Sequence, residues 1–321
     1  MRHSCSRTWE IVGAPFELGA PEPGSAGAPL SIREAGLSSL VRGLPGHGLE
    51  GIDSGDVGCP EGEDGDSRPK NLPQLVEFAD AVMERLDDVY ARGATPVVLG
   101  GDHSVSIPSV TSAARHLRSG FGEDAELGLI WVDAHPDLET PESSPSGYCH
   151  GMAGAALMGI GAVELTGLGG FSPKVRPANM VLIGLRDVLR AERALIEELG
   201  VMAYTASDVE RLGMAEVCAR SFTHMESATS GFVVSFDMDA CDPLEAPGVD
   251  YPEPGGLTFR EARLLAECAA EAPGLLCIEV VEVNPRLDRE ARSSKLAVGF
   301  IRAAMLGSPL APASGDLGGN A

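Results

Sequence analysis

The chain is short of basic residues. Lys and Arg number 24 against 47 Asp and Glu, which gives a formal net charge of -23 at pH 7. A partner that carries phosphates, whether a nucleic acid or an anionic membrane surface, would be repelled by this charge rather than bound. The shortage therefore excludes those partners and leaves solubility as the main use of the acidic surface.

Long hydrophobic runs are also missing. No segment approaches the roughly 18 consecutive apolar residues of a membrane span. The start, MRHSCSRTWEIVGAPFELG, lacks the apolar core of about 7 to 15 residues that marks a secretory signal. The seven cysteines form no CxxC pair, and their odd number does not suit a disulfide framework. We expect a cytoplasmic protein with reduced thiols.

Short apolar segments alternate with amphipathic ones along most of the chain. Buried strands are predicted at residues 95–101, 126–133, 179–185, 231–237 and 275–283. Residues 75–93 place apolar side chains three or four positions apart, as in a helix that buries one face. The same helical pattern recurs at 192–200, 260–272 and 293–305. This alternation predicts an α/β fold with a parallel sheet and helices on both faces.

No shift in composition divides the chain into two domains. The stretches richest in Gly, Pro and Ser, at 14–29 and 53–71, are expected to be long loops. No internal repeat and no low-complexity linker is present. We predict one domain over residues 1–308, followed by a disordered C-terminal tail over 309–321.

Four of the predicted strands end in polar residues that a hydrophobic core would not tolerate. They are GGDHS with His103, VDAHPD with Asp133, His135 and Asp137, SFDMD with Asp237 and Asp239, and EVVEVNP with Glu282. The carboxyl ends of parallel strands meet at one rim of the sheet, where open α/β folds bind ligands. Residues two apart on an extended backbone point the same way, so we expect these side chains to converge.

Carboxylates gathered in this way need a cation. Four of them would repel one another and raise each other's pKa. Two divalent ions would cancel the four charges, and the two imidazoles would complete the coordination. A mixed set of carboxylate and imidazole without thiolate favours Mn over Zn or Cu, with Fe, Co or Ni as substitutes. Two such ions activate a water molecule at neutral pH. Each motif alone has a plainer explanation, since DxD also forms capped turns and GGDHS a glycine turn.

The motifs together resemble the ureohydrolase family, which includes arginases and agmatinases. GGDHS, DAHPD, SGYCHG, SFDMDACDPLEAPG, GGLTFRE and EVNP follow one another in the family's order, and GLRDV at 184–188 is closest to arginases. The resemblance covers residues 12–305 and implies an arginase-like three-layer αβα domain with two Mn²⁺ ions. It implies His103, Asp133, Asp137 and Asp237 as ligands of one ion, and Asp133, His135, Asp237 and Asp239 as ligands of the other.

The resemblance also implies a reaction, the hydrolysis of a guanidino group to urea and an amine. In that reaction Asp137 would help to orient the nucleophile, and Glu282 would pair with the guanidinium. His150 of SGYCHG would be the proton-shuttling histidine, for which imidazole has a suitable intrinsic pKa. His150 could instead be a hydrogen-bonded loop histidine. The family further implies a homotrimer or a homohexamer.

This sequence departs from arginases where they grip the amino-acid end of arginine. It reads DLETP where they usually read DINTP or DLNTP, and SGY where they read SGN. RDVL replaces RDVD, and APGVDYP replaces APGxGTP. The residues that these changes bring in are Glu139, Tyr148, Leu189 and Tyr251, while Ser146 remains as a possible polar contact. EPGSA at 22–26 also replaces a basic, glycine-rich stretch.

These changes lead us to expect altered recognition of the substrate tail. A carboxylate such as Glu139 repels a substrate carboxylate and attracts an amine. The substrate would then be agmatine-like or a larger arginine-derived compound stacked on Tyr148 and Tyr251. The alternative is L-arginase activity, giving ornithine and urea, with these side chains turned away.

Three other functions compete with this prediction. A metallophosphoesterase would need a GNH[DE] segment, which the sequence lacks. A deacetylase of the related fold usually keeps one metal and would leave His103, Asp133 and Glu282 unexplained. A catalytically dead relative would be expected to have lost metal ligands, and all six are present.

Overall fold

The computed structural model describes residues 7–62 and 67–308. Within these ranges, eight parallel strands form one sheet in the order β2-β1-β3-β8-β7-β4-β5-β6. Their bounds are β1 Thr8–Ala14, β2 Glu50–Asp56, β3 Thr95–Gly100, β4 Leu127–Val132, β5 Met180–Leu185, β6 Met202–Thr205, β7 Gly231–Asp237 and β8 Leu275–Val281. The predicted parallel sheet is confirmed, and all five predicted strands belong to it.

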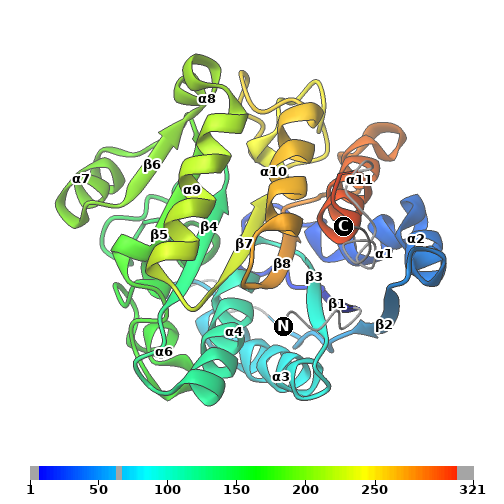
Figure 1. Cartoon of the computed structure of the whole chain (residues 1–321). Helices are drawn as coiled ribbons and strands as arrows, with labels where there is room; N and C mark the ends of the chain where they lie inside the picture. Colours follow the sequence, from blue (N-terminus) through cyan, green and yellow to red (C-terminus); the bar gives the residue numbers. More distant parts are fainter. Residues whose placement is uncertain (1–6, 63–66, 309–321) are drawn as a thin grey trace.

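Helices cover both faces of this sheet (Figure 1). One face packs against α1 Ala28–Ile32, α2 Ser38–Gly43, α8 Ala206–Leu212, α9 Met214–Ala228, α10 Phe259–Glu271 and α11 Arg292–Leu306. The other packs mainly against α3 Leu72–Ala91, α4 Ser106–Phe121, α5 Ala153–Leu157 and α6 Val163–Thr166, with α7 Arg190–Leu199 at its margin. The result is the three-layer αβα architecture expected from the sequence.

The central strands and helices form where the sequence has the clearest hydrophobic pattern. Every residue of β4, LGLIWV, is buried, because this strand has helices on both sides. In α3, the five apolar residues at helical spacing are each at most 1% exposed: Leu75, Phe78, Val82, Leu86 and Val89. The chain leaves α3 through Gly93, whose φ of 73° is easily reached only without a side chain. The helix predicted over residues 75–93 is therefore confirmed.

The loop predicted at residues 53–71 is wrong at its start, because residues 53–56 belong to the edge strand β2. The sequence of β2, EGIDSGD, has no buried face to produce an apolar pattern. Its acids Asp53 and Asp56 instead form ion pairs with Arg33 at 2.9 and 2.5 Å. Likewise, a 3-10 turn at Ser25–Gly27 and the start of α1 occupy the end of the loop predicted at 14–29.

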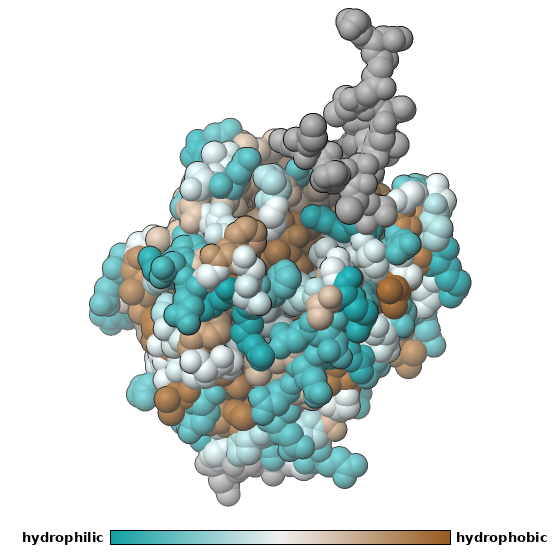
Figure 2. Space-filling model, turned by 60° about the horizontal axis from the view of Figure 1, so that its bottom comes forward, coloured by the Kyte–Doolittle hydropathy of each residue, from teal (hydrophilic) through white to brown (hydrophobic). Residues whose placement is uncertain are grey.

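The surface agrees with the acidic composition. On the face shown in Figure 2, hydrophobic residues lie in small separate groups among hydrophilic ones. No helix in the described part of the chain is long and apolar enough to cross a membrane. The six cysteines within the described ranges are free. The predicted tail at 309–321 lies outside the described residues.

The sheet order brings together the strands that carry the predicted site. Strands β3, β8, β7 and β4 are neighbours, although β3 and β4 lie far from β7 and β8 in the sequence. Each of the four is followed by, or ends in, one of the polar motifs. The carboxyl edge of these four strands is therefore where the predicted site residues meet.

Candidate metal centre

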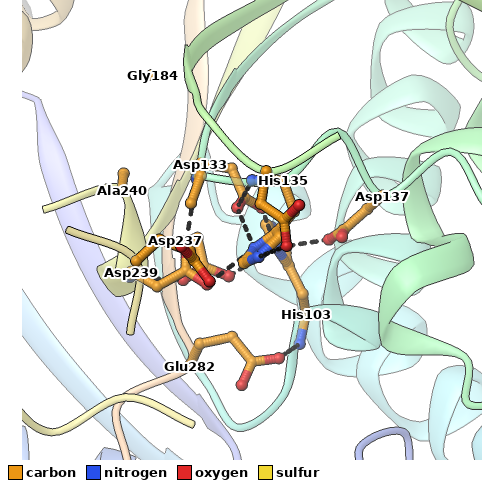
Figure 3. Close-up of polar contacts among 12 residues, drawn as sticks. His103, Asp133, His135, Asp137, Gly184, Asp237, Asp239, Ala240 and Glu282 are labelled. Atoms are coloured by element: carbon orange, nitrogen blue, oxygen red, sulfur yellow. Dashed lines mark hydrogen bonds and ion pairs between the residues drawn. The ribbon is translucent and has the colours of Figure 1, made fainter. Parts of the chain in front are cut away.

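Two histidines and four aspartates converge at this edge (Figure 3). His103 opens a short 3-10 turn after β3, and Asp133 follows β4 directly. Asp237 is the last residue of β7, and Asp239 lies in the 3-10 turn that follows it. His103 and all four acids, Asp133, Asp137, Asp237 and Asp239, are buried.

The cluster divides into two groups of ligand atoms that share Asp133. The Nδ1 atom of His103 lies 3.0 Å from the Oδ2 atoms of three acids, Asp133, Asp137 and Asp237. The Nδ1 atom of His135 lies 3.4 Å from the other oxygen of Asp133, Oδ1, and 3.1 Å from Oδ2 of Asp239. The two oxygens of Asp133 thus face different groups, as a carboxylate does when it bridges two cations. Three ligand atoms lie within 4.8 Å of one another in each of two clusters, His103 with Asp133 and Asp237, and Asp133 with His135 and Asp239.

The donor set fits divalent cations. The Nδ1 atom of His103 is buried and makes no aligned hydrogen bond within the described structure, although three carboxylate oxygens surround it. Burial, together with the charges of Asp239 and Asp133, raises the pKa of Asp237 well above its usual range. Burial and Asp133 likewise raise the pKa of Asp239 to about 7. Cations between these oxygens would remove the repulsion that raises both pKa values.

The side chains meet at one rim of the sheet as predicted, but the backbone that aims them is not the extended one that we expected. We expected extended backbone to align residues two apart, but β4 ends at Val132 and Asp239 lies in a 3-10 turn. Asp137 has a φ of 52° and Glu282 a φ of 61°, in the left-handed region that a residue with a Cβ rarely occupies. Such strained backbone collects at functional sites, where the surrounding structure holds it in place. Bent loops therefore aim Asp137 and Glu282, whereas Asp237 still belongs to strand β7.

Glu282 and His150 lie beside the cluster. The backbone N–H of His103 donates to Oε1 of Glu282 at 2.7 Å, and Nδ1 of His150 lies 3.6 Å from the same oxygen. Burial lowers the pKa of His150, but the Glu282 carboxylate outweighs it and raises that pKa to about 9. The Glu282 carboxylate therefore favours the protonated form of the His150 imidazole.

A cavity of about 240 Å³ opens above these residues. Four of the five predicted tail-facing residues line it, namely Glu139, Ser146, Leu189 and Tyr251. Tyr251 stands over the two histidines, with ring centroids 5.4 Å from His150 and 6.2 Å from His135. Burial and the nearby Asp137 charge raise the pKa of Glu139, against a hydrogen bond from Ser144.

The fifth predicted tail residue, Tyr148, does not line this cavity. Its ring lies 4.3 Å from the Lys70 ammonium, which is the distance of a cation–π contact. Of the two tyrosines on which we expected a larger substrate to stack, Tyr251 lines the cavity and Tyr148 contacts Lys70 instead.

Two further acids of the cavity did not stand out in the sequence. Glu192 is buried at the start of α7, where its carboxylate accepts from the backbone N–H groups of Leu138 and Leu189 at 3.0 and 2.9 Å. Burial raises its pKa to about 7. Asp187 lies at the rim, 3.8 Å from Nε2 of His135. The available signal for Glu192 was its place three residues into a helix, where an acid commonly caps the N-terminus.

Arg186 connects the walls of the site. Within the described residues its guanidinium donates to backbone carbonyls alone, which belong to Gly184, Asp239, Ala240, Cys241 and Glu253. The shortest of these contacts, 2.6 Å, is to the carbonyl of Asp239. Arg186 therefore joins the turn that carries Asp239 to the segment that carries Tyr251. A parallel sheet with acids and imidazoles converging at the carboxyl ends of its strands is the arrangement of a metal-dependent hydrolase.

Comparison with known proteins identifies the family. A model of the Arginase family matches residues 7–307. An arginase of Bacillus caldovelox is 40% identical over 293 residues, which are 91% of this chain and 95% of that protein. An arginase of Brevibacillus brevis is 38% identical over 298 residues, with 92% and 97% covered. The solved structure of the Bacillus caldovelox arginase matches with a TM-score of 0.87 and 38% identity, covering 95% of this chain and 99% of that one.

The chain therefore belongs to the arginase family, as the sequence motifs predicted. It is a hydrolase of C–N bonds in linear amidines, which is the enzyme class expected from the same motifs.

Proposed function

We propose that this protein hydrolyses L-arginine to ornithine and urea with two Mn²⁺ ions. The support for arginine is that the similar proteins named arginase share 36 to 40% identity with it over nine tenths of its length. This was the alternative to the altered tail specificity that we expected from the sequence. Other divalent transition metals could replace Mn²⁺, because carboxylate and imidazole also bind them.

The main observation in support of the proposal is a carboxylate oxygen of Glu282 that has no hydrogen-bond partner among the described residues. Its Oε1 accepts from the backbone N–H of His103, whereas its Oε2 is buried with no hydrogen-bond partner among the described residues. A buried acceptor without a donor is costly. A guanidinium in the cavity would supply that donor, since its planar N–H groups match a carboxylate.

The residues proposed to hold the ions are His103, Asp133, His135, Asp137, Asp237 and Asp239. Bound there, the two ions would supply a water molecule activated for attack at neutral pH. Asp137 lies beside His103 and would accept a hydrogen bond from the nucleophile. Glu282 would hold the planar guanidinium over the cluster.

His150 would provide the proton that the leaving amine needs. An amine departs easily only after protonation, and a donor near the site must therefore be charged at working pH. In the metal-free structure the Glu282 carboxylate raises the pKa of His150 to about 9, which favours the protonated imidazole. His150 also lines the cavity, within reach of a bound substrate.

A substrate with an amine at its tail is the second candidate. It is favoured by Glu139, which lines the cavity where a neutral amide would face the substrate carboxylate in arginases. Glu192 and Asp187 add two more acids to the cavity, and none of the described residues that line it is Lys or Arg. A cationic tail would be attracted to this wall.

Urea release from a substrate panel after incubation with Mn²⁺ tests both candidates. The panel holds L-arginine, agmatine, 4-guanidinobutyrate, 3-guanidinopropionate and Nω-hydroxy-L-arginine. A wide margin for arginine would support the first candidate, and preference for agmatine would support the second. Urea from none of them would contradict both.

The assembly and location of the protein are also proposals. We propose a homotrimer or homohexamer in the cytoplasm, with a small guanidino compound as ligand and no nucleic-acid or membrane partner. Light scattering on the purified protein would test the assembly, and a monomer mass would contradict it.

A further inference from the structure

A chain of buried hydroxyl groups runs behind His103, on the side away from the carboxylates. The Nε2 atom of His103 lies 2.8 Å from Oγ of Ser235, and that oxygen lies 3.3 Å from Oγ of Ser106. The Ser106 hydroxyl donates in turn to Oε1 of Glu279. All four side chains are at most 1% exposed. They come from four elements: the turn after β3, β7, the first turn of α4, and β8.

The Glu279 carboxylate at the end of this row of hydroxyl groups fixes the direction of its hydrogen bonds. An ionised carboxyl group only accepts hydrogen bonds. The Ser106 hydroxyl donates its hydrogen bond to Glu279, so the Ser106 oxygen can only accept a hydrogen bond from Ser235. Ser235 then accepts from Nε2 of His103, which must carry the imidazole proton. The lone pair is therefore on Nδ1, the atom that faces Asp133, Asp137 and Asp237.

We propose that Glu279, acting through Ser106 and Ser235, is a positioning residue that holds His103 in the tautomer able to bind a metal. Carboxylates that orient metal-binding histidines usually contact the ring directly; here two hydroxyl groups transmit the effect. Trp131 stacks on His103 with centroids 3.9 Å apart, which fixes the plane of the ring but not the nitrogen that carries the proton. The inference rests on the proposed function, because it requires His103 to be a metal ligand.

Ser109 provides a matched control. It lies three residues after Ser106 in α4, is equally buried, and donates to the other oxygen of Glu279. Its further hydrogen bond is to the Ser106 carbonyl at 3.3 Å, and neither bond leads to Ser235. Ser106→Ala and Ser109→Ala each remove one buried hydroxyl and one bond to Glu279. Only Ser106→Ala breaks the path to His103.

The test is Mn²⁺ binding by equilibrium dialysis over a range of free Mn²⁺, with paramagnetic resonance to distinguish an isolated ion from a pair. Loss of an orienting partner typically costs about 10- to 100-fold in metal affinity. We expect Ser106→Ala to lower the affinity for one of the two Mn²⁺ ions by about tenfold. The affinities of Ser109→Ala should stay within about twofold of those of the parent protein. Equal losses in the two variants, or no loss in Ser106→Ala, would overturn the proposal.

Two further measurements separate the possible causes. Equal melting temperatures of the two metal-free variants would show that Ser106→Ala does not act by loosening the core. If Ser106→Ala does not fold, Ser235→Ala and Glu279→Gln replace it. Ser235→Ala should lower the affinity for the same Mn²⁺ ion. Glu279→Gln should preserve that affinity, because its amide oxygen can still accept a hydrogen bond from Ser106. A loss of affinity in Glu279→Gln but not in Ser235→Ala would overturn the proposal. A parent protein that binds no Mn²⁺ would instead contradict the proposed function.

Discussion

The Oε1 atom of Glu282 accepts a hydrogen bond from the backbone N–H of His103 at 2.7 Å, across 179 positions of the sequence. The residue proposed to hold the guanidinium is thereby fixed to the turn that carries a proposed metal ligand. A shift of β8 relative to β3 would disturb both together.

Glu282→Gln separates the charge of this side chain from its structural role. The amide oxygen can still accept from His103, so metal content should remain at the parent level. The charge that pairs with a guanidinium is lost, and loss of one partner of a buried charged pair costs about 2 to 5 kcal/mol. We expect kcat/KM to fall by roughly two to three orders of magnitude, measured as urea release alongside Mn²⁺ content. Unchanged kcat/KM would show that Glu282 does not hold the substrate.

Asp237→Ala should abolish turnover supported by metal. Asp237 contacts His103, and its other oxygen accepts from the backbone N–H of Asp239, so both groups of the cluster depend on it. The measurement is urea release and bound metal at saturating Mn²⁺. Glu245→Ala, in the segment that follows β7, is the control and should remain active. Full activity in Asp237→Ala would contradict the two-metal proposal.

Glu139→Asn should improve the use of arginine. If Glu139 faces the substrate tail, this change removes repulsion of a carboxylate, and we expect the ratio of kcat/KM for L-arginine to that for agmatine to rise roughly tenfold, equivalent to about 1.4 kcal/mol. Tyr148→Asn is the control, because Tyr148 lies against Lys70 and outside the cavity. A ratio that changes in Tyr148→Asn and not in Glu139→Asn would show that Tyr148, and not Glu139, faces the substrate tail.

The pairing of His150 with Glu282 predicts a pH-dependent stability of the metal-free protein. The pKa of His150 is raised from 6.5 to about 9 in the folded state. A raised pKa means that the folded state binds the proton more tightly, so the contribution is fully present below pH 6.5 and is lost as the pH rises through about 9. Urea unfolding of chelator-treated protein at pH 6, 7.5 and 10 would measure it. His150→Asn and Glu282→Gln should each remove this dependence, and a parent-to-variant difference that stays constant with pH would contradict it.

The fold could be predicted where burial leaves a pattern in the sequence. The central strand β4 and the helix α3 show it, since each has residues that must face a core. The edge strand β2 does not, because its side chains are mostly exposed and its charges are satisfied by Arg33. Strand β6 is only four residues long and lies at the opposite edge.

Proximity within the site could be predicted only in part. The meeting of His103, Asp133 and Asp237 follows from parallel strands that end at one rim. The position of Asp137 depends on a left-handed turn, and that of Tyr148 on its contact with Lys70 from a distant segment. Neither has a local signal in the sequence. The role of Arg186 could not be predicted either, because its hydrogen bonds in the described part of the chain are to backbone carbonyls, which any residue can provide.

The bonds of Arg186 also bear on how a substrate enters. The segment from Asp242 to Gly256 carries Tyr251 over the mouth of the cavity, and for that segment to swing open as a lid, Arg186 would have to release the Glu253 carbonyl, which it contacts at 2.7 and 3.1 Å. A permanently charged guanidinium gives up such acceptors only at considerable cost. Opening of this wall would therefore break the hydrogen bonds of Arg186, whereas rotation of the Tyr251 side chain, which is 38% exposed, would leave them in place.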